Sequence, residues 1–87
     1  MNIQIDSETR KFIESKGNGE FVLDLMRAQG WCGAIEQPMV SLGKPRSKPF
    51  MFTPIDVDGL TMYKQNTFGE DLNLRIVLTK FLSAKML

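Results

Sequence analysis

Near the middle of the chain, residues 20–43 read EFVLDLMRAQGWCGAIEQPMVSLG. This stretch holds the only cysteine and the only tryptophan of the sequence, side by side between Gly30 and Gly33. An apolar, strand-like run over residues 21–26 leads into the pair, and a weaker run over residues 37–42 leads away from it. Because glycine accepts positive φ and lets a ligand or backbone approach closely, the Gly30–Gly33 segment is predicted to be a turn that presents a thiol.

The run from Glu20 to Arg27 predicts a central strand. One face would carry Phe21, Leu23 and Leu25, and the other Val22, Asp24 and Met26. Both faces are mostly apolar, which is typical of a strand covered on both sides. Asp24 is the exception, and we expect it near the rim of the sheet, either solvated or paired.

Before this strand, Ile3–Ile5 predicts a short first strand and the following residues predict a helix of two to three turns. Asp6 or Ser7 offers the N-cap oxygen, and the Gly17-Asn18-Gly19 segment ends the helix because its residues suit a left-handed cap. We expect the helix to cover a sheet.

After the strand, residues 28–34 are predicted to form a cysteine loop, and Pro38–Gly43 a second strand that tolerates its proline on an edge or at its first position. Residues 44–49 form a basic, proline-punctuated loop. Its three positive charges suit an anion, but a solvated loop is the favoured interpretation.

The C-terminal half predicts further short strands. Phe50–Val57 is expected to place Phe52, Ile55 and Val57 in the core, with Pro54 disturbing the ladder. Asp58-Gly59 predicts a tight hairpin, because such turns need positive φ, and residues 60–63 return from it.

The last part of the chain alternates clearly. Residues 66–70 are turn-rich, and residues 72–79 alternate like a half-buried strand. The apolar residues at 81–82 and 86–87 either continue that strand or dock as a short tail. The fold class is therefore a β-rich α+β domain over residues 1–87, a small sandwich or partial barrel of short strands with one N-terminal helix.

Composition excludes several functions. The chain has 87 residues, enough for one small domain, and its 11 basic residues are nearly balanced by 10 acidic ones, so we expect no nucleic-acid partner. No apolar run approaches the length of a membrane span. One cysteine excludes an internal disulfide, and the start of the chain has no signal-peptide pattern, so we expect a cytoplasmic protein. Histidine is absent, which excludes Ser-His-Asp and Cys-His catalysis within the chain.

Cys32 is the candidate reactive thiol, although a lone cysteine also suits a small buried side chain. The amides of Gly30 and Gly33 and the charge of Arg27 favour its thiolate. A thioredoxin-type pair is excluded because position 35 is an isoleucine. A structural zinc site needs four ligands, so we expect no metal and no cofactor in the monomer, and an iron–sulfur cluster only if it is shared between subunits or with an added thiol.

The segment Gly30-Trp31-Cys32-Gly33, followed by Pro38 and by Ser41-Leu42-Gly43-Lys44-Pro45, resembles the small CC/Se-motif proteins. These are HesB-like proteins, related to the A-type iron–sulfur carriers, and some contain selenocysteine. The resemblance extends to the first strand and helix, to residues 21–27 and to the hairpin at residues 57–60. It implies a HesB-like β-rich fold and a role in thiol redox or iron–sulfur chemistry.

The departures from the family pattern decide the expected function. The family motif is Gly-Cys-Cys-Gly, or the same with selenocysteine second, so Trp31 replaces the first cysteine and Cys32 keeps the second. The carriers' loop ligand corresponds to Trp31, and their C-terminal Cys-x-Cys pair has no counterpart in residues 83–87, so none of the three carrier ligands is present.

Three functions remain open, of which a carrier of an intact iron–sulfur cluster is the least favoured because its ligands are absent. The favoured one is a non-catalytic module that binds a protein partner or a second copy of itself, with Trp31 as an aromatic anchor between Gly30 and Gly33. The alternative is thiol-dependent redox exchange or transient metal or cluster binding through Cys32. Whether the protein is an enzyme is left open, with a non-enzymatic role favoured.

Overall fold

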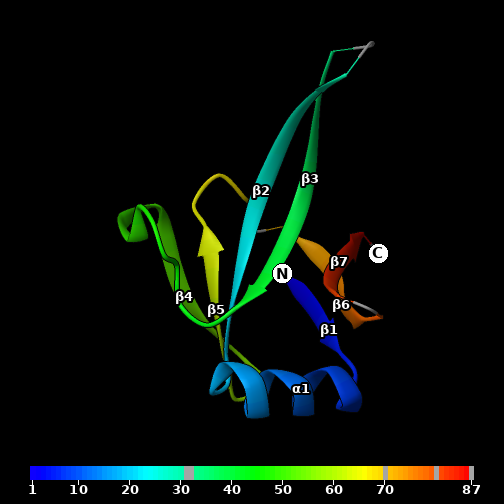
Figure 1. Cartoon of the computed structure of the whole chain (residues 1–87), viewed down its shortest axis with the longest axis vertical. Helices are drawn as coiled ribbons and strands as arrows, with labels where there is room; N and C mark the ends of the chain where they lie inside the picture. Colours follow the sequence, from blue (N-terminus) through cyan, green and yellow to red (C-terminus); the bar gives the residue numbers. More distant parts are fainter. Residues whose placement is uncertain (31–32, 70, 80, 87) are drawn as a thin grey trace.

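The computed structural model describes residues 1–30, 33–69, 71–79 and 81–86. Within these residues the elements follow in the order β1 (Asn2–Ile5), α1 (Ser7–Gly17), β2 (Glu20–Gly30), β3 (Gly33–Leu42), the short 3₁₀ helix η1 (Pro49–Met51), β4 (Phe52–Val57), β5 (Leu60–Gln65), β6 (Asn73–Leu78) and β7 (Leu82–Met86). They form a four-stranded sheet, a three-stranded sheet and one α-helix below them (Figure 1). This confirms the β-rich α+β class.

The N-terminal strand and helix form as predicted. Asp6 is the N-cap of α1, and its carboxylate accepts a hydrogen bond of 2.9 Å from the backbone N–H of Thr9. Hydrogen bonding by Thr9 lowers the pKa of the Asp6 carboxyl, which favours the negative charge at the helix N-terminus. At the other end Asn18 adopts the left-handed conformation, with φ of 54°, that ends the helix.

The four-stranded sheet has the order β3-β2-β5-β4, which confirms β2 as a central strand and β3 as an edge strand that tolerates Pro38. β2 runs antiparallel to β3 and parallel to β5. β4 and β5 form the predicted hairpin, in which Val57 pairs with Leu60. Asp58 and Gly59 connect them with φ of 52° and 83°, the positive values that a two-residue hairpin turn requires.

The three-stranded sheet has the order β1-β6-β7, with β6 parallel to β1 and antiparallel to β7. The end of the chain therefore neither continues β6 nor docks as a tail. Instead it reverses and pairs back along β6, with Leu78 opposite Leu82 and Leu74 opposite Met86. The ladder satisfies backbone groups that a docked tail would leave to solvent.

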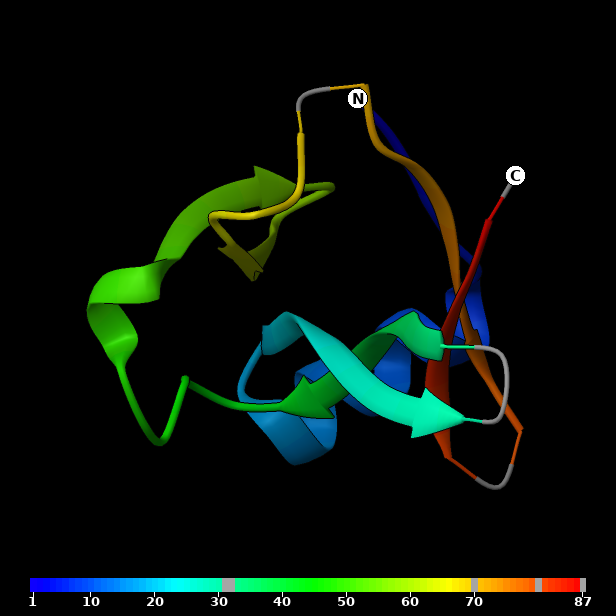
Figure 2. The same cartoon turned by 90° about the horizontal axis from the view of Figure 1, so that it is seen from above.

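Both sheets and the helix share one core. Its buried members are Ile13, Phe21, Leu23, Leu60, Met62, Leu72, Leu74 and Ile76. The strands are arranged around this core without closing into a barrel (Figure 2), and α1 covers one end (Figure 1).

The prediction that Phe52 belongs to the core is wrong. Ile55 and Val57 pack against the core, but Phe52 lies half-buried and lines a pocket instead. The reason is the period of a strand, since Phe52 differs by an odd number of residues from the other two and therefore faces the opposite side of the sheet.

Candidate functional site

The strands β2 and β3 form an arm that extends beyond the rest of the sheet. β2 pairs with β5 over Glu20–Leu23, whereas it pairs with β3 along its whole length, from Phe21 opposite Leu42 to Gly30 opposite Gly33. Figure 1 shows the two strands continuing together past the other strands, along the longest axis of the molecule. We define the arm as residues 24–30 of β2 with residues 33–39 of β3.

The arm corrects the prediction of a loop over residues 28–34. β2 continues to Gly30 and β3 begins at Gly33, so all but residues 31 and 32 of the predicted loop belong to strands. Glycine and alanine disfavour strands when judged alone, but pairing with a neighbouring strand overrides that preference. The signal that was missed is the short spacing between two glycines flanked by strand-like runs.

Three of the predicted site residues, Arg27, Gly30 and Gly33, lie on the strands of this arm. Gly30 and Gly33 form its last pair, and Gly33 has φ of 112°, which side-chain-bearing residues rarely adopt. Arg27 is paired with Glu36. Arg27 lies three residues before Gly30 in β2, which corresponds to about 10 Å of strand. Trp31 and Cys32 lie outside the described residues.

The metal prediction stays a prediction. Within the part of the chain that the structure describes, no group of three or more His, Cys, Asp or Glu side chains is placed to hold a metal ion. The same part contains no helix long and apolar enough to cross a bilayer.

The basic loop over residues 44–49 lines a cavity together with β2, an arrangement that the sequence did not indicate. Lys44 and Arg46 line a cavity together with Asp24 of β2, although twenty residues separate Asp24 from Lys44 in sequence. Each feature is visible in the sequence, but their proximity depends on the pairing of β2 with β3. Lys44, Arg46, Ser47 and Lys48 are exposed, as the prediction of a solvated loop requires, and the loop also lines this cavity.

Tyr63 lies on the same outer face as Val22 of β2, opposite it in the parallel ladder. Its hydroxyl donates a hydrogen bond of 3.1 Å to the Glu20 carboxylate. Desolvation raises the pKa of Tyr63, and the interaction with Glu20 raises it further.

Comparison with protein families gives one finding for this arrangement. The model of the CC/Se motif containing family matches residues 1–87, the whole length of the sequence. The chain belongs to the CC/Se motif containing family. Within that family match, residues 30–33 connect the two strands of the arm. Comparisons with curated proteins and with solved structures give no match.

Proposed function

We propose that this CC/Se-family chain is a HesB-like, non-catalytic binding module whose arm engages a protein partner, with Trp31 as the anchor. The observation that carries the proposal is the extension of β2 past β5, which sets the ends of the arm apart from the core. A ribbon that projects from a folded body provides surface for a partner without disturbing the body. Tryptophan is enriched among the residues that dominate binding energies at protein interfaces.

The family motif supports the same assignment. The resemblance implies redox or cluster chemistry for a motif with two adjacent thiols, whereas this chain has Trp31 in place of the first thiol. Replacing a thiol by an indole removes a nucleophile and adds a large apolar contact surface. We therefore infer that binding was retained on this arm while the carriers' ligand set was lost, and that the monomer holds no cofactor of its own. A single cysteine suits a reducing compartment, and we place the protein in the cytoplasm.

The alternative function uses Cys32 directly. The observation that favours it is the position of the thiol between Gly30 and Gly33, the last pair of the arm, since loop glycines leave room for an approaching group. Cys32 would then exchange disulfides with a partner thiol, or share a metal or cluster with a second subunit.

Photo-crosslinking from position 31 tests the proposal. A photoreactive phenylalanine replaces Trp31 in one variant and Lys11 in a control, because Lys11 is exposed on α1 at the opposite end of the molecule (Figure 1). We expect a crosslinked product of defined mass only from position 31. Excess wild-type protein should compete for the partner and reduce the yield of this product, and excess Trp31→Ala protein should not. A product that contains two copies of this chain identifies the partner as itself. Equal products from both positions, or equal competition by Trp31→Ala, would show that the arm is not the binding element.

The thiol alternative is separated by Cys32→Ser in the same assay. If the crosslinked product persists with Cys32→Ser, binding does not need the thiol. If the product disappears, and the native wild-type thiol reacts readily with a disulfide reagent, Cys32 carries the function. A thiol that reacts only after unfolding excludes the alternative.

A further inference from the structure

The outer face of the four-stranded sheet carries a cavity that is separate from the arm end. Phe21 and Leu23 of β2 are fully buried in the core, so Val22 and Asp24 face the other side of the sheet. The chain between β3 and β4 spans the sheet, because these strands are its two edges. Against Val22 and Asp24 it lines a cavity of about 510 Å³, which is open to solvent at the exposed residues Ser41, Arg46 and Ser47.

The size of this cavity is that of a small-molecule site. Its volume lies within the range of roughly 300–1,000 Å³ that is usual for ligand pockets. Val22, Pro45 and Phe52 supply apolar surface, and the hydroxyl groups of Ser41 and Ser47 supply hydrogen-bonding groups. Five of its nine lining residues are polar or charged, so the lining is more polar than that of a typical ligand pocket and suits a charged ligand.

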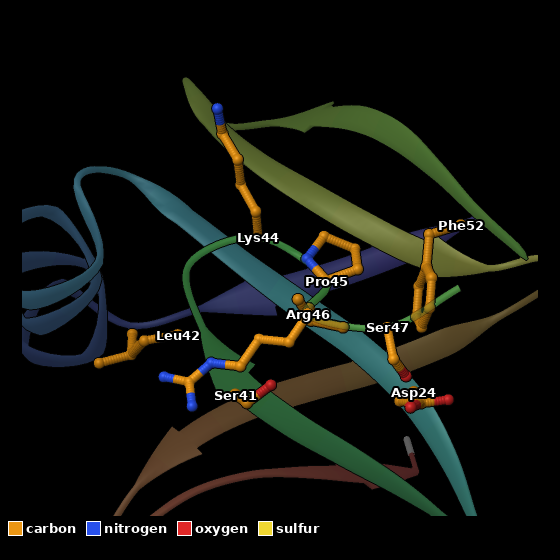
Figure 3. Close-up of a pocket in the computed structure, with 9 residues that line it drawn as sticks. Asp24, Ser41, Leu42, Lys44, Pro45, Arg46, Ser47 and Phe52 are labelled. Carbon is orange, nitrogen blue, oxygen red and sulfur yellow. The ribbon is translucent and has the colours of Figure 1, made fainter. Parts of the chain in front are cut away.

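Opposite charges mark the two ends of the cavity. Arg46 extends toward Ser41, whereas Ser47 points toward Asp24, and Lys44 extends away from the other side chains (Figure 3). The ion pair found among the described residues joins Arg10 to Glu14, so neither Arg46 nor Asp24 is neutralised by a described side chain. Asp24 accepts a hydrogen bond of 2.7 Å from the backbone N–H of Leu25 at one oxygen, and a carboxylate accepts several more.

The register of the sheet sets the spacing of Ser41, toward which Arg46 extends, and Asp24. Ser41 is paired with Val22, and Asp24 lies two residues farther along β2. Residues placed diagonally in this way on neighbouring strands lie about 7–8 Å apart. An extended dipeptide also spans at most about 7 Å.

We propose that this cavity binds a small zwitterion of dipeptide size. Its anionic group lies at Arg46 and Ser41, its ammonium group at Asp24 and Ser47, and its apolar part against Val22 and Phe52. Asp24 is the first residue of the arm, but none of these residues belongs to residues 30–33, so the proposal does not depend on Trp31 as an anchor.

Titration of the ¹⁵N-labelled chain tests the charge requirement with three probes built on the same dipeptide. Alanyl-leucine carries both charges, N-acetyl-alanyl-leucine lacks the cation, and alanyl-leucine amide lacks the anion. We expect alanyl-leucine to shift the backbone amide signals of residues 22, 24, 41, 47 and 52. Each singly charged probe should bind roughly tenfold or more weakly, because it loses one charge-assisted hydrogen bond. Equal binding of the three probes, or no shift at millimolar concentration, would overturn the proposal.

Matched variants assign each charge to its residue. Asp24→Asn should remove the preference for alanyl-leucine over the N-acetyl probe, and Arg46→Gln the preference over the amide. Lys48→Gln is the control, because it removes one positive charge from the same loop at a residue that does not line the cavity. It should retain the wild-type affinities for all three probes. Equal weakening by Arg46→Gln and Lys48→Gln would show diffuse attraction to the loop and no site. The probe comparison on the wild-type chain stands even if a variant fails to fold.

Discussion

The two ends of β2 differ in what holds them. At residues 20–23 the strand has β3 on one side and β5 on the other, and Phe21 and Leu23 are fully buried. Beyond Leu23 the ladder continues with β3 but no longer with β5. One continuous strand therefore belongs to the folded body at its start and to a projecting ribbon at its end.

Under the proposed function, this difference separates stability from binding along a single element. A two-stranded ribbon is only marginally stable by itself, so the arm depends on the body for its position. Among the residues of β2 whose burial is described, the fully buried core members Phe21 and Leu23 lie before the arm begins. Under the proposed function the arm serves a partner, while Phe21 and Leu23 are constrained by packing.

The largest expected effect comes from truncating the same residue type on the same face at two places. Leu23 is fully buried, whereas Leu25, two residues farther along β2, is half-buried. Leu23→Ala should lower the free energy of unfolding by about 2–5 kcal/mol, the range for buried leucines. Leu25→Ala should cost about 1 kcal/mol, since less apolar surface returns to water. Denaturant unfolding measures both, and equal losses would remove the distinction between body and arm.

A smaller effect distinguishes Gly59, in the turn between β4 and β5, from Gly33 at the end of the arm. A Cβ at Gly59 would lie 3.1 Å from Nη2 of Arg10, which donates to the Asp58 carbonyl, and φ is 83° there. Gly59→Ala should therefore lower the free energy of unfolding by about 1–2 kcal/mol. At Gly33 φ is 112°, but nothing lies within 4 Å of an added Cβ.

Gly33→Ala is the matched control for Gly59→Ala. Its strain falls on the last pair of the arm, which can open without unfolding the body, so the global loss should stay under about 1 kcal/mol. Denaturant unfolding of both variants decides the point. A larger loss for Gly33→Ala would mean that the arm end is coupled to the core.

The smallest effect is a pH dependence confined to the body. The chain contains one tyrosine, so absorbance of the phenolate reports Tyr63 alone. Its pKa in the folded protein is raised by burial and by Glu20 above the usual 10.0. The resulting stabilisation is complete below pH 10 and is lost as the pH rises through the folded pKa.

The difference in melting temperature between wild type and Tyr63→Phe should therefore shrink above pH 10. Glu20→Gln is the control, because it removes the acceptor charge and should lower the tyrosine pKa of the folded protein toward its usual value. A wild-type tyrosine that titrates at or below the usual value contradicts this contact.

Much of the fold could be predicted from local pattern. The N-cap at Asp6, the left-handed Asn18 and the Asp58-Gly59 turn depend on short-range preferences that a sequence displays directly. The length of the arm was missed because its distal residues have weak strand preferences and extend only through pairing with each other. The return of residues 82–86 along β6 was missed for the same reason.

The candidate sites divide in the same way. The Gly30–Gly33 segment was found from composition, since a unique cysteine and tryptophan between two glycines stand out in the sequence. The charged cavity was not found, because Asp24 and Arg46 come to line the same cavity only through strand register and the crossing of the β3–β4 connection. The distance between two residues so far apart in sequence is set by tertiary structure, which local sequence patterns do not display.

Native-state hydrogen exchange of the whole chain tests most directly the claim that β2 is divided between body and arm. Amides of residues 20–23 that bond within the ladders should exchange only through global unfolding, and their protection should fall with denaturant as the global stability does. The corresponding amides of residues 26–30 and 33–36 should exchange through a local opening of lower free energy that is insensitive to low denaturant. Equal protection and equal denaturant dependence along all of β2 would contradict the claim.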